Sequence, residues 1–283
     1  MIDSIKVLDR GEVALIDHMG NDQSIVNSAR ISYSKGAKKV SNDRDLIRYL
    51  MRHRHTSPLE HVEFQFYVKA PIFIFRQWHR HRTWAFSEIS GRYSDLPEEF
   101  YVPEENKITK QSKSNKQGGS EEILEYARSI QQSFFNESSN DFSRYNSRLK
   151  SGMRKELARI NLPLSTYSEM YAKVDLHNLF HFLSLRLDSH AQYEIRVYAE
   201  AIAELIKPIV PLAWEAFEDY KLNSINLSSL DIESIQKIMA DFIGRLEYDH
   251  EFVDSIIEMY SQNISNKREK SEFIDKIGKL LKV

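Results

Sequence analysis

The alternation of apolar and polar side chains from Val62 to Lys69 is the feature that most constrains the fold of this chain. Valine and phenylalanine occupy every second position, and glutamate, glutamine, tyrosine and lysine fill the positions between them. Because successive side chains of a strand point to opposite faces, this period of two predicts a β-strand. Pro71 ends the strand and begins a helix over residues 72–81. The chain therefore contains a sheet with at least one helix beside it.

Strand and helix patterns alternate through the first 220 residues. Apolar spacing predicts two short strands within residues 5–19, around Gly11, and another strand over 166–174. Helical spacing predicts helices over residues 21–30, 42–54, 121–150, 154–161, 177–187 and 191–206, and a short one around Trp214. Ser57-Pro58-Leu59-Glu60 has the form of a capping box, with proline at the first helical position.

Two segments differ from this alternation. Residues 104–120 are polar and rich in lysine, serine and glycine, so they predict a mobile loop. Residues 223–283 carry two or three amphipathic helical stretches and few side chains that could do chemistry. We therefore expect one domain over residues 1–222 and an appended C-terminal helical module over 223–283.

The composition of the chain excludes several kinds of site and partner. The chain has no cysteine, which excludes disulfides, zinc–thiolate sites and thiol nucleophiles. Covalent chemistry must then use another nucleophile or a cofactor. The formal net charge of −2 gives no overall positive field for nucleic acid. No apolar run approaches a membrane span and the first residues do not resemble a signal peptide, so we expect a cytoplasmic protein without a membrane partner.

Arginines are concentrated between Arg76 and Arg92. Arg76, Arg80, Arg82 and Arg92 crowd into a short stretch of a nearly neutral chain. Guanidinium groups bind phosphate and imide edges bidentately, and the amides of Ser90-Gly91 can receive a phosphate oxygen. The alternative is a solvated basic patch. We interpret the stretch as an anion-binding active site for a phosphorylated small molecule.

A second group of polar side chains lies further along the chain. His177 and His181 are one helical turn apart, a spacing that can hold a metal ion, and Asp188 follows. A metal-dependent nucleotide hydrolase is therefore one alternative. Because the pair lacks the internal glutamate of zinc proteases, we favour histidines that hydrogen-bond a large ligand and predict no metal. A nucleotide-binding regulator, with residues 223–283 as its partner-binding module, is the non-enzymatic alternative.

The string from Arg80 to Arg92, RHRTWAFSEISGR, resembles the signature of the flavin-dependent thymidylate synthases. That signature is RHR, two residues, Ser, four residues, Ser, one residue and Arg. Blocks at residues 19–22, 57–61, 69–73, 158–163 and 185–192 also resemble blocks of the family in the family's order. The resemblance covers roughly residues 1–220. It implies an α/β fold with a mixed, largely antiparallel sheet and a helical lobe, to which the C-terminal module is appended.

The resemblance also implies a reaction that needs no cysteine. The family converts dUMP to dTMP with methylenetetrahydrofolate as carbon donor and reduced FAD as hydride donor, and NADPH reloads the flavin. Binding and polarisation activate the pyrimidine, which is electrostatic catalysis by preorganised donors. The family assembles as a homotetramer with active sites shared between subunits, so these small molecules and further copies of the chain are the expected partners.

The family's functional residues map onto matching positions of this chain. Arg186 is the expected activator of the uracil ring and Ser90 the second catalytic residue, while Arg159 is expected to reach the dUMP phosphate from a neighbouring subunit. The full set expected to contact dUMP is Gln77, Trp78, His79, Arg80, Glu88, Ile89, Ser90, Gly91, Arg92, Arg159 and Arg186. The set expected to contact FAD is Ser57, Arg80, His81, Arg82, Glu88, Asp175, Leu176, His177 and His181, with His55 and His190 as further neighbours.

Three positions depart from the family pattern. Ala85 occupies the position of the first serine in the signature. Asp175-Leu176-His177 stands where the family usually has Asn-x-Arg, and His181 stands where it often has asparagine. A permanent cation is thereby replaced by a histidine, whose charge changes near neutral pH. We expect FAD affinity to depend on pH for this reason.

Overall fold

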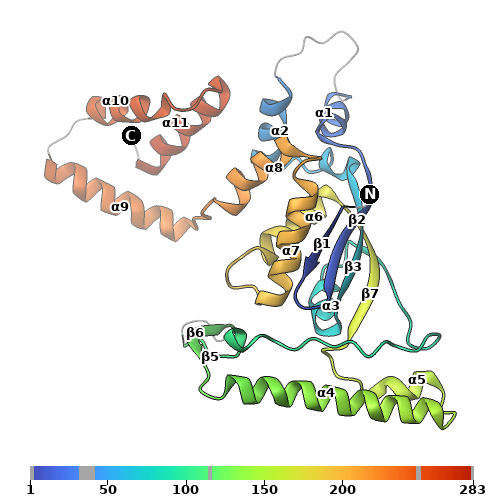
Figure 1. The fold of residues 1–283 in the computed structure, drawn as a ribbon. Coiled ribbons are helices and arrows are strands. Elements are labelled where there is room, and N and C mark those ends of the chain that lie inside the picture. The colour runs from blue at the N-terminus through green and yellow to red at the C-terminus, as the bar shows by residue number, and fades with distance from the viewer. Residues whose placement is uncertain (1–2, 32–41, 114–116, 247–249, 282–283) are drawn as a thin grey trace.

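The computed structural model describes residues 3–31, 42–113, 117–246 and 250–281 (Figure 1). Its centre is a five-stranded sheet with the order β1-β2-β3-β7-β4, in which every neighbouring pair is antiparallel. The strands are β1 (Ser4–Val7), β2 (Gly11–Met19), β3 (Glu63–Pro71), β7 (Tyr167–Asp175) and β4 (Ala85–Glu88). The predicted α/β fold with a largely antiparallel sheet is confirmed.

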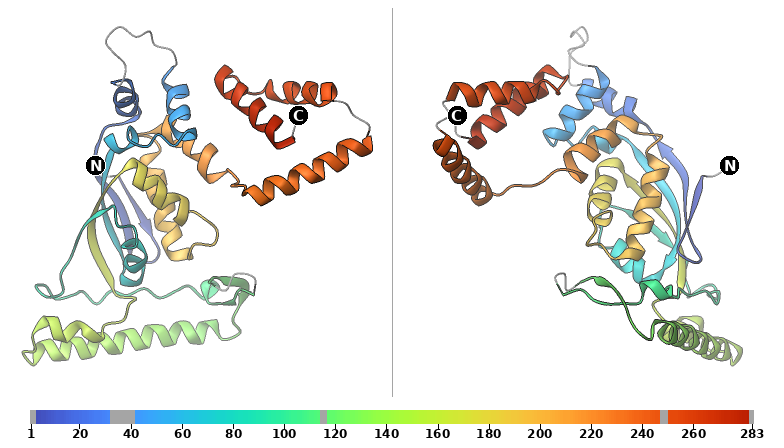
Figure 2. Two further views of the ribbon diagram at one scale, coloured as in Figure 1. Left: turned by 180° about the vertical axis from the view of Figure 1, so that it is seen from behind. Right: turned by 60° about the vertical axis from the view of Figure 1, so that its left-hand side comes forward.

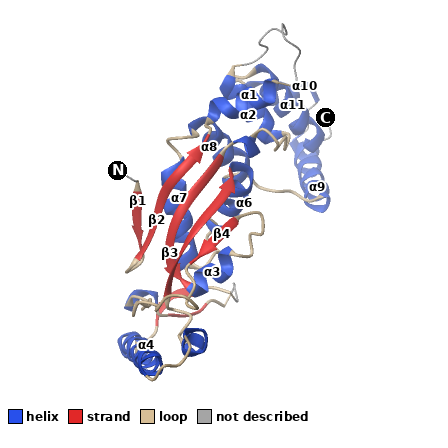
Figure 3. Cartoon of the chain, turned by 90° about the vertical axis from the view of Figure 1, so that its right-hand side faces the viewer, coloured by secondary structure: helices blue, strands red, loops and turns tan. Residues whose placement is uncertain are grey.

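The alternation in the sequence sets which face of the sheet is covered. Phe64, Phe66 and Val68 of β3 are fully buried, whereas the residues between them are only partly buried. Helices α6 (Leu176–Arg186) and α7 (Tyr193–Ile206) cover the buried face (Figures 1 and 3). Helix α3 (Ile72–Trp78) follows β3 directly, as Pro71 predicts. The main core forms between this face and these helices.

One residue ends β7 and begins α6. Asp175 is the last residue of the strand, paired with Glu63 of β3, and is also the N-cap of the helix. Its carboxylate accepts a hydrogen bond from the backbone nitrogen of Asn178 at 2.9 Å. This interaction satisfies a free amide of the first helical turn and places a negative charge at the positive end of the helix.

Further helices lie at the two ends of the sheet (Figure 2). At one end are α1 (Asp22–Arg30), α2 (Asp43–Arg52) and α8 (Pro211–Phe217), followed by a π-helical turn, η4 (Glu218–Leu222). At the other end are the long helix α4 (Ala127–Lys150), α5 (Lys155–Ala158) and the 3-10 turn η3 (Arg159–Asn161). The buried carboxylate of Asp22 accepts from the backbone nitrogens of Leu212 and Ala213 at 2.7 and 3.0 Å, which joins α1 to α8.

The C-terminal segment is helical, as predicted: α9 (Ser229–Leu246), α10 (His250–Ser261) and α11 (Lys267–Leu281). Two carboxylates of α11 reach α2. Glu269 lies 2.6 Å from a terminal nitrogen of Arg48, and Glu272 lies 2.5 Å from Nε of Arg52. Arg48 also pairs with Glu215 of α8 and Asp219 of η4. These ion pairs attach the last helix of the chain to α2.

Some local predictions are wrong. The expected capping box at Ser57 is absent, because the 3-10 turn η1 (Leu59–His61) begins after Pro58 with no side-chain cap. Strand β4 lies in a stretch where no strand was predicted. Part of the expected loop at 104–120 forms the turn η2 (Glu105–Lys107) and a hairpin of β5 (Thr109–Gln111) and β6 (Gly119–Ile123). Residues 114–116 lie outside the described part. No helix among the described residues is long and apolar enough to cross a membrane.

Candidate active site

Arg186 is held at the end of α6 by two hydrogen bonds. Its Nε donates to Nε2 of His81 at 3.1 Å, and a terminal nitrogen donates to the carbonyl oxygen of Gln77 at 3.3 Å. Burial lowers the pKa of Arg186, but a guanidinium remains charged at neutral pH. Within the described parts of the chain no carboxylate forms an ion pair with it. The structure therefore presents an oriented cation whose charge is not neutralised by a neighbour.

His81 is the partner that fixes this orientation. Its side chain is buried, and burial, the charge of Arg186 and the proximity of His181 together lower the pKa of His81 to about 4. The imidazole is therefore neutral near pH 7. Its Nε2 then accepts from Arg186, which leaves the proton on Nδ1. The predicted flavin residue His81 and the predicted catalytic residue Arg186 thus form one unit.

The predicted phosphate ligands Ser90, Gly91 and Arg92 lie in one turn. Backbone nitrogens of Tyr93 and Ser94 donate to the carbonyl oxygen of Ser90 at 3.0 and 3.1 Å. Gly91 is packed so closely that a Cβ there would lie 2.9 Å from Cδ of Arg159 in the same chain. Ser90, Gly91, Arg92 and Arg159 are therefore brought together within one chain. A contribution of Arg159 to a neighbouring subunit's site stays a prediction.

Carboxylates already occupy part of this region. Nε of Arg92 lies 3.4 Å from Glu156, and Glu88 accepts from the hydroxyl of Ser168 at 2.7 Å. Ala85, the departure from the signature, lies at the start of β4 opposite Lys173 of β7. Because the Arg92–Glu156 pair is partly exposed, an incoming phosphate can compete for this arginine.

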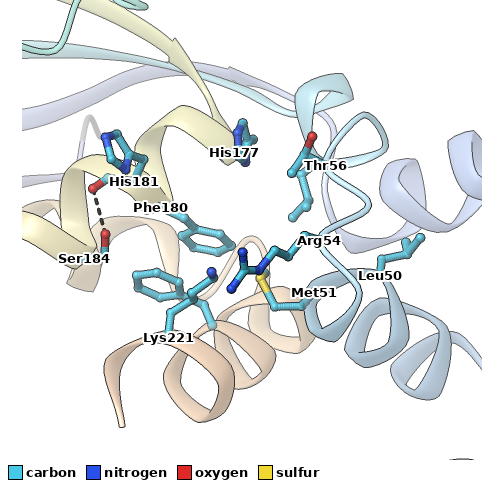
Figure 4. Close-up of a pocket in the computed structure, with 11 residues that line it drawn as sticks. Leu50, Met51, Arg54, Thr56, His177, Phe180, His181, Ser184 and Lys221 are labelled. Carbon is cyan, nitrogen blue, oxygen red and sulfur yellow. Dashed lines mark hydrogen bonds between the residues drawn. The ribbon is translucent and has the colours of Figure 1, made fainter. Parts of the chain in front are cut away.

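A separate pocket lies between α2, η1, α6 and η4 (Figure 4). We call it the α2–α6 pocket; its volume is about 190 Å³. Its apolar walls include Leu50, Met51, Phe180 and Phe217. Its polar lining consists of Arg54, Thr56, His177, His181, Ser184 and Lys221. Apolar walls with two cations, Arg54 and Lys221, suit a ligand that carries both a ring system and phosphate.

Of the polar residues that line the α2–α6 pocket, two were predicted to contact flavin and four were not singled out in the sequence. His177 and His181 line it, and the ring centroid of His181 lies 6.0 Å from that of His81. Arg54, Thr56, Ser184 and Lys221 were not predicted. The signal that could have found Arg54 is the run of basic side chains His53-Arg54-His55 at the predicted end of a helix.

Other predicted residues have structural roles or lie elsewhere. The side chains of Trp78 and Leu176 are in the core, so only their backbones remain for a ligand. The carboxylate of Asp175 caps α6. Arg80, Arg82, Ser57 and Ile89 are exposed, while His79 packs against Phe75 and Phe86. His190 lines a different pocket, beside the β5–β6 hairpin.

The arrangement does not favour the hydrolase alternative. Asp188 is bound by the ring nitrogen of His190 at 2.8 Å rather than grouped with His177 and His181. Within residues 3–31, 42–113, 117–246 and 250–281, no three histidine or carboxylate side chains are grouped to hold a metal ion.

Known proteins resemble this chain over most of its length. The family model described as "Thymidylate synthase complementing protein" matches residues 14–212. The chain is 52% identical over 241 residues to a flavin-dependent thymidylate synthase of Thermus thermophilus, covering 83% of this chain and 86% of the relative. The chain belongs to the flavin-dependent thymidylate synthase family. A relative of the same description from Wolbachia pipientis wMel is 49% identical over 235 residues, covering 83% of each chain.

A solved structure agrees with the family and the fold. The UMP/dUMP methylase PolB from Streptomyces cacaoi, bound with 5-Br dUMP, is 35% identical to this chain and superposes with a TM-score of 0.68. The match covers 78% of this chain and 100% of the methylase chain. This chain is thus an enzyme of a flavin-using family, and its described residues carry the paired His81–Arg186 unit in that fold.

Proposed function

We propose that this enzyme methylates dUMP to dTMP, with methylenetetrahydrofolate as carbon donor and with FAD reduced by NADPH. The observation that carries the proposal is the His81–Arg186 unit, which offers an oriented cation without a cysteine anywhere in the chain. A pyrimidine gains negative charge at its carbonyl and N3 edge when it becomes a carbon nucleophile. A fixed guanidinium that faces this edge stabilises the charge and needs no reorganisation during the reaction.

The phosphate of dUMP is assigned to the Ser90–Arg92 turn and Arg159. Amides and arginines of this turn supply donors to phosphate oxygens, and Gly91 allows the nucleotide to approach the backbone. Gln77 contributes its carbonyl to the orientation of Arg186 and its side chain hydrogen-bonds Gln192 at 2.5 Å. These contacts support a site in which base and phosphate are held by different elements.

FAD fits the side chains around the α2–α6 pocket. The apolar walls can take a ring, and His177, His181, Arg54 and Lys221 can face a diphosphate. The bound flavin supplies the hydride in this chemistry. The residues of the chain would bind and orient it, and neutral His81 orients Arg186 without adding a second positive charge.

Assembly as a homotetramer remains part of the proposal. The face of the sheet opposite α6 and α7 carries Tyr67, Tyr171 and other partly buried or exposed side chains of β3 and β7. Exposed aromatic side chains on a sheet face are typical of a contact between subunits, which supports the proposed assembly. We also propose the division into residues 1–222 and an appended helical module over 223–283; ion pairs between α11 and α2 are among the contacts between the two parts.

The first experiment is a flavin spectrum followed by a reaction assay. The purified protein, supplemented with FAD, is mixed with dUMP, methylenetetrahydrofolate and NADPH, and both NADPH oxidation and dTMP formation are measured. We expect both to require dUMP. Flavin bound without dTMP formation would support the nucleotide-binding regulator. Nucleotide hydrolysis that chelator abolishes, in a protein that binds no FAD, would support the hydrolase.

The second experiment tests Arg186. Arg186→Ala is expected to lower turnover by a factor of about 100 or more while it still binds FAD, because a donor to developing charge is worth about that much. Arg128→Gln is the matched control: Arg128 is exposed on α4, lies 3.9 Å from Glu105 and does not line the α2–α6 pocket, so this variant removes an arginine charge outside the site. Full activity of Arg186→Ala would remove Arg186 from the mechanism.

A further inference from the structure

Helix α2 ends in a turn that normally requires glycine. The backbone nitrogen of His55 donates to the carbonyl of Leu50 at 2.9 Å, and that of Arg54 donates to Met51 at 3.2 Å. These two bonds define a Schellman motif, in which the residue after the C-cap adopts the left-handed conformation. That residue is Arg54, with φ of 58°. Glycine is preferred at such a position because a Cβ is strained there.

The arginine at this strained position faces the α2–α6 pocket. Leu50 and Met51, whose carbonyls accept the two turn hydrogen bonds, also line the pocket. The turn therefore forms one edge of the cavity, and the side chain of Arg54 extends from it towards Phe180 and Lys221 (Figure 4). A residue kept in an unfavourable backbone conformation beside a cavity points to a function for its side chain.

The charges around the pocket are unbalanced. No ion pair of Arg54 or Lys221 is present among the residues that the structure describes, and both side chains line the cavity. The neighbouring arginines behave differently: Arg48 and Arg52, on the same helix, are neutralised by Glu269 and Glu272 of α11. Glu269 and Glu272 thus pair with arginines of α2 and not with Arg54. The positive charge of the pocket is therefore not neutralised by them.

We infer that Arg54, supported by Lys221, is a phosphate-binding residue of the α2–α6 pocket and binds the diphosphate of FAD. The inference rests on the proposed function and extends it to Arg54 and Lys221, which are outside the set of residues that the family resemblance predicts to contact FAD. Two cations, one from the turn after α2 and one from η4, then face His177 and His181 of α6 across the cavity. A permanent charge on Arg54 supplies what the histidine at position 177 lacks where the family usually has arginine.

The turn geometry offers a test that separates binding from folding. Arg54→Gly removes the side chain and at the same time relieves the left-handed backbone, so this variant is expected to be at least as heat-stable as the wild type. FAD affinity is measured by titrating flavin-free protein and following flavin fluorescence. We expect the dissociation constant to rise about tenfold or more, the loss typical of one charge-assisted hydrogen bond.

Three further variants complete the design. Arg54→Lys keeps the charge and is expected to recover part of the affinity, whereas Lys221→Met is expected to weaken FAD binding by a smaller factor. The control Arg128→Gln should bind FAD like the wild type. Because charge attraction is screened by salt, wild-type affinity should fall more steeply with ionic strength than that of Arg54→Gly.

Other outcomes overturn the inference in distinguishable ways. Wild-type affinity in Arg54→Gly, with dTMP formation intact, refutes the role of Arg54 and leaves the proposed function standing. An unchanged FAD dissociation constant with a raised KM for NADPH refutes the assignment to FAD and moves the phosphate to the nicotinamide dinucleotide. Wild-type protein that binds no FAD refutes both the inference and the proposed function.

Discussion

The low pKa of His81 makes a prediction about how the enzyme responds to acid. Below neutral pH an unfolded chain protonates its histidines, but folded His81 stays neutral because it is buried beside Arg186 and near His181. The unfolded state then binds more protons than the folded state, so stability is lost as pH falls. The contribution is fully present above about pH 6.5 and is lost between that value and the folded pKa of about 4.

The size of the loss follows from the two pKa values. The ordinary value for histidine is 6.5 and the value for His81 is about 4. This difference corresponds to about 3 kcal/mol when the whole interval has been crossed. At about pH 5 the unfolded histidine is mostly protonated and the folded one mostly neutral, so about 2 kcal/mol of stability should already be lost. Protonation also removes the acceptor of the Arg186 hydrogen bond, so activity should fall in the same interval.

The assay compares pH slopes rather than absolute stabilities. Urea unfolding of flavin-free protein is measured between about pH 7 and pH 5 at one protein concentration, for the wild type and His81→Gln. Glutamine does not titrate in this range. The free energy of unfolding of His81→Gln should therefore fall by about 2 kcal/mol less than that of the wild type between these pH values. His61→Gln, at an exposed histidine of η1, is the control and should keep the wild-type slope. Parallel curves for the wild type and His81→Gln would refute the reasoning.

Two further predictions concern packing and charge. Arg48→Met removes the cation shared by Glu269 and the carboxylates of α8 and η4; because Arg48 is nearly buried and its partners are only partly so, unfolding free energy should fall by about 2 kcal/mol. Glu269→Gln should cost much less in the Arg48→Met background than alone, and equal costs in a thermal-unfolding cycle would contradict the pairing. Gly91→Ala places a Cβ 2.9 Å from Cδ of Arg159 and should raise KM for dUMP about tenfold with little loss of stability. An unchanged KM would show that Arg159 moves aside without consequence.

The sequence predicted elements whose pattern is carried by many side chains. The alternation in β3 and the helical spacing of α2, α6 and α7 depend on burial of one face, and the structure confirms them. Strand β4 was missed because it has only four residues and pairs with β7, which lies about eighty residues further along the chain. No local pattern encodes a pairing over that distance.

In the candidate site, too, the sequence predicted features formed by neighbouring residues and missed those formed by distant ones. The arginine-rich signature identified the Ser90–Arg92 turn, because its residue types are specific and contiguous. The hydrogen bond from Arg186 to His81 joins residues more than a hundred positions apart, so only the fold reveals it. Arg54 was missed for a different reason: helix ends are recognised by glycine, and the glycine position of this Schellman turn holds an arginine.

Asp175, the residue shared by β7 and α6, fixes the number of residues between the sheet and Arg186, the proposed catalytic arginine. Asp175 closes the strand register and caps the helix, and Arg186 is the last residue of that helix. Each residue of a helix turns the following side chain by about 100°. Inserting or deleting one residue between Asp175 and Arg186 would therefore rotate the guanidinium away from His81 while sheet and helix both remain intact. The hydrogen bond between Arg186 and His81 therefore requires a fixed number of residues between Asp175 and Arg186. The length of the chain beyond α8 is not constrained in this way.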